Sequence, residues 1–240
     1  MDDKKHILLL STSTVFGSGY LAYAEREITD FLGSSRRVLF VPFALHDRDG
    51  YAARVRRRFA ECGYEIDSLH DATDARAAVA NADAIFVGGG NTFRLLKTLY
   101  DLQLLEVVRE NVVRGMRYIG SSAGSNIAGR TIQTTNDMPI VQPPSFNALG
   151  LVAFQINPHF VDADPGSKDM GETREERIAQ FHEESETPVI GLREGAMVRV
   201  EAGVATLVGS AGARLFRKDR SAVELRAGSV LEGFVNSERI

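Results

Sequence analysis

Residues 116–129 read MRYIGSSAGSNIAG, and this segment decides the fold class. Its apolar start predicts a short strand over 116–120, which passes into a turn of small residues and then a helix. A G-x-S-x-G pattern runs from Gly120 to Gly124, with Ser122 at its centre. A sharp strand-to-helix turn tolerates only small neighbours and presents its central side chain at a cleft. The segment therefore predicts an α/β protein with a candidate nucleophile, Ser122, at a strand end.

Strand and helix patterns alternate on both sides of this segment. Apolar runs predict strands over 6–11, 37–42, 64–69, 83–87, 151–156 and 188–192. Helical patterns cover 20–31, 51–62, 72–81, 92–114 and 172–184, and a loop or hairpin is expected over 131–144. Such alternation predicts a doubly wound, mostly parallel sheet with helices on both faces. The alternating runs of 197–225 are expected to add antiparallel hairpins at the edge of the same sheet.

Composition restricts the protein class. The 240 residues are 44% hydrophobic and 25% charged, which is typical of a globular chain, and without a linker or repeat we expect one domain over 1–240. No apolar run approaches the roughly 18 residues of a membrane span. A net charge of -4 offers no basic footprint for nucleic acid. The single cysteine, Cys62, and the absence of a signal-like start lead us to expect the cytoplasm.

A nucleophilic serine needs a base, and one of the five histidines is well placed. His159 lies in the stretch NPHF just after the predicted strand 151–156, so we expect it at the same carboxyl edge of the sheet as Ser122. Two carboxylates could orient it: Glu194, in GLREG after another strand, and Asp137, on the loop between serine and histidine. Chain order does not choose between them, because unrelated folds build such triads in different orders.

Backbone N–H groups at two strand ends are candidates for an oxyanion hole. Ala123 opens the helix after Ser122, and Gly90 belongs to the run GGGNT that follows the strand 83–87. This run lacks the lysine of a phosphate loop, and Gly17 to Ala22 fits a dinucleotide fingerprint poorly. No metal-binding spacing such as H-E-x-x-H is present either, although His159, Asp162 and Asp164, with His182 further on, could be imagined as ligands. We therefore expect neither an organic cofactor nor a metal.

Taken together, these motifs resemble peptidase E, the α-aspartyl dipeptidase family of serine peptidases. The matching segments run in order through most of the chain: GGGNT (88–92), IGSSAGSN (119–126), TTNDMPI (134–140), INPHF (156–160), GETREERI (171–178) and IGLREG (190–195).

The resemblance implies a fold similar to the class I glutamine amidotransferases and hydrolysis of dipeptides with an amino-terminal aspartate, without cofactor or metal. It implies Ser122 as nucleophile and His159 as base, while the third member is described in two ways that match Asp137 and Glu194. The chain departs from the amidotransferases in having serine for their cysteine. It also lacks a glutamate two residues after His159, which counts against glutamine hydrolysis.

An aspartyl substrate requires a cation, and the predicted helix 172–184 supplies two candidates. Arg174 and Arg177 lie three residues apart and would share one face. The fork of arginine suits a carboxylate, so we take Arg174, in the matched segment, as the selector. Asn91 and Thr92 are further candidates for holding the substrate.

Two alternative functions differ in class. One is a related hydrolase of the same fold acting on other aspartyl peptides, as cyanophycinases do, and the other is a non-catalytic member that binds a small molecule. The family resemblance also leads us to expect a homodimer.

Overall fold

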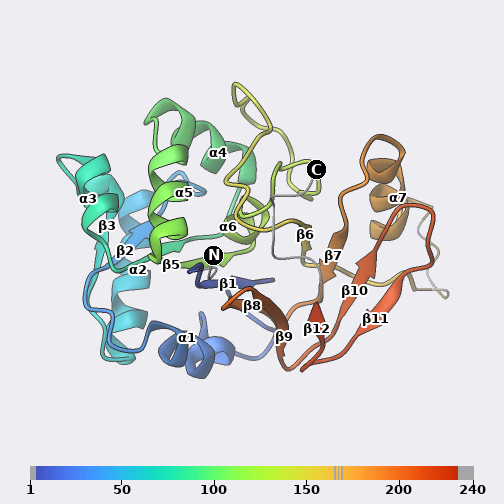
Figure 1. Ribbon diagram of the computed structural model, residues 1–240, viewed down its shortest axis with the longest axis horizontal. Helices are drawn as coiled ribbons and strands as arrows, with labels where there is room; N and C mark the ends of the chain where they lie inside the picture. The colour runs from blue at the N-terminus through green and yellow to red at the C-terminus, as the bar shows by residue number, and fades with distance from the viewer. Residues whose placement is uncertain (1–3, 165, 167, 169, 232–240) are drawn as a thin grey trace.

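The computed structural model of the chain describes residues 4–164, 166, 168 and 170–231 (Figure 1). Within these residues the strands are β1 Ile7–Leu10, β2 Val38–Val41, β3 Ile66–Ser68, β4 Ala84–Val87, β5 Arg117–Ser121, β6 Gln155–Pro158, β7 Val189–Leu192, β8 Ala196–Glu201, β9 Val204–Gly209, β10 Ala213–Phe216, β11 Val223–Leu225 and β12 Val230–Leu231. The helices are η1 Ala22–Ala24, α1 Glu25–Leu32, α2 Arg48–Glu61, η2 Leu69–Asp71, α3 Ala75–Asn81, α4 Thr92–Asp101, α5 Leu105–Arg114, α6 Ala123–Asn126 and α7 Arg174–Glu184.

Eight of the described strands form one mixed sheet in the order β12-β9-β8-β1-β5-β4-β2-β3. Five neighbouring strands, in the spatial order β1-β5-β4-β2-β3, run parallel to one another. At the β1 edge the sheet is extended by three antiparallel strands, β8, β9 and β12. This arrangement confirms the α/β, mostly parallel fold class. The parallel strands place Leu10 beside Ser121 and Val87 beside Gly120, so their carboxyl ends meet at one edge.

Helices cover both faces of this sheet because its parallel strands are buried on both sides. In β1, Ile7 and Leu9 pack with residues of α3 to α6, whereas Leu8 and Leu10 pack with α1 and α2. Figure 1 shows the same layers, with α3, α4 and α5 on one side of the strands and α1 on the other. Continuous apolar runs such as ILLL in β1 are typical of such doubly covered strands.

The carboxyl-terminal part differs from the sequence expectation, because the hairpins do not all join the same sheet. β8, β9 and β12 extend the main sheet, but β10 and β11 pair with β7 and β6 in a second sheet of order β11-β10-β7-β6. Its inner residues, among them Ile156 and Ile190, belong to the same apolar cluster as Ile7 and Leu9. On its other face, Phe160, Ile178, Val189 and Phe216 form a small cluster under α7. The alternation pattern predicted the strands but not the sheet that each one joins.

Other predicted elements are shifted or divided. The region 92–114 forms two helices, α4 and α5, separated by a turn in which Gln103 has a φ of 55°. The strand predicted over 151–156 begins only at Gln155, because the backbone of Leu151 and Val152 hydrogen-bonds to Ala128 instead of a strand. Residues 131–144 form a loop rather than a hairpin, and Thr131 makes one isolated bridge to Asn147.

No helix among the described residues has both the length and the apolarity to cross a membrane.

Candidate active site

Ser122 lies at the turn from β5 into α6, in a strained conformation. Its φ is 51° and its ψ is -107°, a combination that residues with a Cβ rarely adopt. The turn is closed by the Ser122 N–H, which donates to the Leu10 carbonyl at 3.0 Å. Gly124 is required at the turn because a Cβ there would collide with the Val87 carbonyl. The turn thus holds the half-buried Ser122 side chain at the carboxyl edge of the main sheet.

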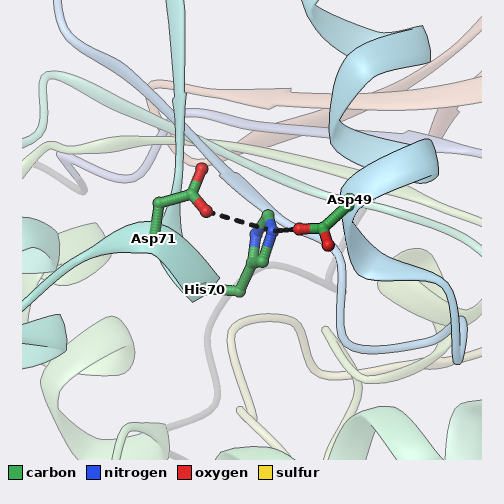
Figure 2. A group of neighbouring side chains, drawn as sticks. All are labelled: Asp49, His70 and Asp71. Carbon is green, nitrogen blue, oxygen red and sulfur yellow. Dashed lines mark hydrogen bonds and ion pairs between the residues drawn. The ribbon is translucent and has the colours of Figure 1, made fainter.

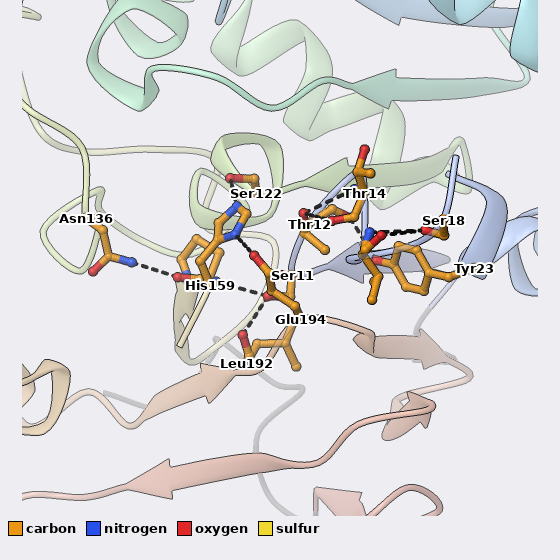
Figure 3. Close-up of polar contacts among 12 residues, drawn as sticks. Ser11, Thr12, Thr14, Ser18, Tyr23, Ser122, Asn136, His159, Leu192 and Glu194 are labelled. Atoms are coloured by element: carbon orange, nitrogen blue, oxygen red, sulfur yellow. Dashed lines mark hydrogen bonds and ion pairs between the residues drawn. The ribbon is translucent and has the colours of Figure 1, made fainter. Parts of the chain in front are cut away.

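His159 reaches Ser122 from the second sheet. It follows β6, and its Nε2 lies 3.0 Å from the Ser122 Oγ (Figure 3). The sequence placed both residues at the carboxyl edge of one sheet, which is wrong, since β6 pairs with β7 in the second sheet. The two still meet because the carboxyl ends of both sheets face each other. Asn126 of α6 helps to join them by donating to the Ile156 carbonyl of β6 at 2.7 Å.

Of the two candidate carboxylates, the structure brings only Glu194 to His159. Glu194 follows β7, the neighbour of β6, and its Oε1 lies 2.8 Å from the His159 Nδ1. Ser122, His159 and Glu194 therefore form a continuous hydrogen-bonded chain, whose geometry is that of a nucleophile, a base and an orienting acid. The Glu194 side chain is 47% exposed, so the acid lies at the rim of the site.

Asp137 lies at the amino end of α4 instead. Its Oδ2 accepts the Thr92 N–H at 2.7 Å and the Thr92 hydroxyl at 2.6 Å. A carboxylate at this end of a helix satisfies a free N–H and interacts favourably with the helix dipole. Within the described residues Asp137 makes no hydrogen bond or ion pair with His159.

The two candidates for an oxyanion hole are the N–H of Ala123, the residue after Ser122, and the N–H of Gly90, in the glycine loop after β4. The glycine loop after β4 packs against Ser122, since a Cβ on Gly89 would lie 3.1 Å from the Ser122 Cβ. The Gly89 backbone hydrogen-bonds the Tyr51 hydroxyl. The N–H groups of Ala123 and Gly90, by contrast, have no acceptor in the part of the chain that the structure describes. Gly90 has a φ of 134°, and a Cβ at this position would lie 2.7 Å from the Ala44 carbonyl oxygen, so the position requires glycine.

Comparison with known proteins identifies the family of the chain. The family model of peptidase family S51 matches residues 7–208. The chain belongs to peptidase family S51. It is 52% identical over 226 residues to a protein of Streptomyces coelicolor named "Peptidase E", with 94% of this chain and 93% of that one covered. It is 49% identical over 228 residues to a protein of Drosophila melanogaster named "Probable alpha-aspartyl dipeptidase", with 94% and 95% covered.

Solved structures support the fold. A crystal structure of a peptidase from an acI-B1 Actinobacterium matches with a TM-score of 0.69 at 18% identity, covering 95% of this chain and 96% of the other. Membership of family S51 makes the chain a serine peptidase, and the resemblance inferred from the sequence motifs is confirmed.

The side chains of Asn91 and Thr92 form hydrogen bonds with other residues of the protein. Asn91 caps α4 by accepting the Arg94 N–H at 3.0 Å, and its Nδ2 donates to the Met138 carbonyl at 2.8 Å. Thr92 is bound to Asp137. In this S51 peptidase both residues therefore fix the glycine loop and the 134–140 loop relative to each other, and a substrate contact by either one stays a prediction.

Arg174 begins α7 and has no ion-pair partner among the described residues. It is half-buried, and its pKa is lowered by burial and by the charge of Arg177. Arg177 lies 3.7 Å from Glu172. Glu175, the residue after Arg174, binds Arg214 at 2.7 Å. Arg214 also lies 3.7 Å from Asp162, which is three residues after His159. Ion pairs thus tie the start of α7 to the loop that carries the base.

The other histidines do not approach Ser122. The buried His182 hydrogen-bonds the Thr187 carbonyl at 3.1 Å, and His6 lies 3.6 Å from Glu201. Asp162, which the sequence offered as a conceivable metal ligand, instead binds Arg193 through both oxygens.

His70 forms a cluster with Asp71, also in η2, and with Asp49 of α2 (Figure 2). Its Nε2 lies 2.9 Å from Asp49 and 3.2 Å from Asp71, and Arg56 binds Asp71 at 2.6 Å. The two carboxylates already have His70 and Arg56 as partners, and the Asp49 side chain is 94% exposed. We interpret the cluster as surface ion pairing between α2 and η2 rather than as a metal site.

Several residues around Ser122, His159 and Glu194 were not predicted from the sequence. Ser11 accepts the His159 N–H, and Asn136 donates to the carbonyl of the preceding residue, Pro158. Tyr23 donates to the Thr12 carbonyl (Figure 3). Burial, with a contribution from the Glu194 charge, raises the pKa of Tyr23 far above its usual range, so its hydroxyl stays protonated and donates to the Thr12 carbonyl. The only available signal was position, because Ser11 ends a predicted strand and Asn136 lies in a matched motif.

Proposed function

We propose that the protein is an α-aspartyl dipeptidase that cleaves Asp-Xaa dipeptides through an acyl-enzyme on Ser122. The observation that carries the proposal is the chain of contacts from the Ser122 Oγ through both ring nitrogens of His159 to Glu194. The names of the relatives from Streptomyces coelicolor and Drosophila melanogaster support this substrate class.

In the first half of the reaction, the His159 Nε2 takes the hydroxyl proton of Ser122 as the Oγ attacks the aspartyl carbonyl. Glu194 accepts the Nδ1–H, which fixes the tautomer in which Nε2 is free to act as base. The N–H groups of Ala123 and Gly90 stabilise the negative oxygen of the tetrahedral intermediate. His159 then gives its proton to the departing amine, and the peptide bond breaks.

In the second half, water replaces the amine. His159 takes a proton from this water, the hydroxide attacks the aspartyl ester, and the intermediate collapses with the proton returned to the Ser122 oxygen. Free aspartate leaves, and the enzyme is restored.

Selection of aspartate is assigned to Arg174. Arg174 is half-buried and has no carboxylate partner among the described residues, so its guanidinium is suited to bind the side-chain carboxylate of the substrate, since desolvation strengthens a charge pair. Its alanine variant is expected to lose discrimination between Asp-Leu and Ala-Leu, measured as the ratio of their kcat/KM values. The exposed Arg177→Ala is the matched control on the same helix. Unchanged discrimination in the Arg174 variant would remove it from the account.

The function itself is tested by steady-state hydrolysis of Asp-Leu, β-linked aspartyl-leucine and Ala-Leu, with chelator present. We expect turnover of Asp-Leu only, and a loss of about a thousandfold or more in Ser122→Ala. Preference for the β-linked peptide would favour the related hydrolase instead. No turnover, together with no labelling of Ser122 by a fluorophosphonate, would indicate a non-catalytic binding member.

We further propose a homodimer located in the cytoplasm, acting on small peptides without a metal or cofactor. Sedimentation equilibrium tests the dimer, and full activity in chelator tests the metal-free mechanism. A monomer, or activity that returns only when metal is added, would contradict the respective proposal.

A further inference from the structure

The backbone of His159 has an unfavourable conformation. Its φ is 52°, in the left-handed region where the Cβ of a non-glycine residue is crowded. His159 is followed directly by Phe160, whose ring is buried under α7, so the turn occurs at the catalytic histidine itself. A residue held in this region relaxes unless its surroundings fix it.

Two side chains fix the peptide group that joins Pro158 to His159, one at each end. The His159 N–H donates to the Ser11 Oγ at 3.0 Å, and the Pro158 carbonyl accepts from the Asn136 Nδ2 at 2.7 Å (Figure 3). With its donor and its acceptor both engaged, this peptide plane cannot rotate without breaking a hydrogen bond.

Both side chains are themselves held. Ser11 is completely buried, and its hydroxyl donates to the Leu192 carbonyl at 2.6 Å. The Asn136 Oδ1 accepts from the Asn157 Nδ2 at 2.8 Å. Ser11 follows β1 of the main sheet, whereas Leu192 ends β7 of the second sheet, two residues before Glu194. The Ser11 hydroxyl therefore links the end of β1 in the main sheet to the ends of β6 and β7 in the second sheet. His159 follows β6, and Glu194 follows β7.

We propose that Ser11 and Asn136 are positioning residues that clamp the 158–159 peptide and so direct the His159 ring between Ser122 and Glu194. The clamp deepens the proposed function and rests on it for its effect on catalysis. Neither side chain contacts Ser122. Their effect is transmitted through the backbone of His159, where a displacement of about 1 Å can cost as much as a hundredfold in rate.

The experiment compares Ser11→Ala, which removes one end of the clamp, with Asn136→Asp, which keeps the shape but loses the donor. Ser68→Ala is the matched control, because Ser68 is also buried and its hydroxyl bonds a histidine, His70, outside the site. We expect kcat for Asp-Leu to fall about 10- to 100-fold in both clamp variants, with KM changed less than about twofold. The control should keep the wild-type kcat.

A spectroscopic readout separates positioning from general destabilisation. Long-range 1H–15N correlation of the histidine rings, at about pH 9 where imidazoles are neutral, reports which nitrogen of His159 carries the proton. The wild type and Ser68→Ala should show the Nδ1–H tautomer, and the clamp variants should lose it in part. Assignment comes from His159→Gln, and circular dichroism establishes that each variant is folded.

Unchanged kcat and an unchanged tautomer in the folded variants would overturn the proposal. If Ser11→Ala does not fold, Asn136→Asp decides alone, since its residue is in a loop and only half-buried. If the wild type does not hydrolyse Asp-Leu, the proposed function fails, but the tautomer readout needs no substrate and still decides for or against the clamp.

Discussion

At the residue scale, Asp137 and Glu194 differ in what their carboxylates contact. The Glu194 carboxylate contacts the Nδ1 of His159, whereas Asp137 accepts the first N–H of α4. A charged acceptor at a helix amino end stabilises the fold, so Asp137→Asn should lower the free energy of unfolding by about 1 kcal/mol.

Urea unfolding at neutral pH measures this loss. Asp101→Asn is the control, because Asp101 ends the same helix and pairs there with Lys97. A negative charge at a carboxyl end is unfavourable to the dipole, so its removal should cost little. An equal loss in both variants would contradict the role given to Asp137.

The sequence predicted Ser122 and His159 because each follows a strand, one in a small-residue turn and the other in a short polar motif. It did not choose between Asp137 and Glu194 as the acid, since both lie in turns or loops and chain order does not determine which carboxylate contacts His159. Ser11 and Asn136 could not be predicted, because their role depends on a contact between two sheets whose separation the pattern did not reveal.

At the scale of elements, the turn from β5 to α6 depends on close backbone packing. A Cβ on Gly124 would meet the Val87 carbonyl, which is backbone and cannot move aside. Gly124→Ala should therefore lower stability by about 1–3 kcal/mol and reduce kcat, because Ser122 shifts with the turn. Gly19→Ala is the control, since its Cβ would meet only Ala22 at 3.8 Å. Thermal unfolding and Asp-Leu hydrolysis test both, and an unaffected Gly124 variant would contradict the steric argument.

Asp83 forms hydrogen bonds at the amino ends of the parallel strands β2 and β4. Its carboxylate accepts from the side chain of Arg37 and from the N–H groups of Arg37 and Arg36, and these bonds lower its pKa from 3.8 to about 2. Because the folded pKa is lowered, the stabilisation is complete above the unfolded pKa of about 3.9. It is lost as the pH falls from about 4 towards about 2.

The stability difference between wild type and Asp83→Asn should therefore be largest above about pH 4 and should shrink below it. Urea unfolding of both proteins between pH 7 and pH 3 (about one unit apart) measures this difference. A difference that stays constant over this range would contradict the account.

Element type was predictable because apolar runs and helical periods are local properties. Element partners were not, as β10 and β11 show, since both patterns fit either sheet and tertiary packing chose between them. The break between α4 and α5 was equally hidden, because it depends on Gln103 taking a left-handed conformation that the residue type does not favour.

At the scale of the whole molecule, the two sheets share one apolar core. Residues of β1, β4, β6, β7 and β8 belong to one cluster, so neither sheet buries its inner face alone. We expect one cooperative unfolding transition, which is the prediction of a single domain over 1–240. Far-ultraviolet and near-ultraviolet circular dichroism, the latter from tyrosine and phenylalanine because the chain has no tryptophan, should give coincident curves. Two separate transitions would indicate that the second sheet unfolds independently.

The shared core also explains why the site is a property of the whole fold. Ser122 follows β5 of the main sheet, whereas His159 and Glu194 follow β6 and β7 of the second sheet. Any change that moves one sheet against the other alters the distance between Ser122 and His159.

The most direct test of the central claim, a catalytic triad of Ser122, His159 and Glu194, is the kcat for Asp-Leu of Glu194→Gln beside that of Asp137→Asn. We predict a loss of about a hundredfold or more in Glu194→Gln, because the amide no longer fixes the His159 tautomer, and less than about tenfold in Asp137→Asn. The reverse order of losses would contradict the triad.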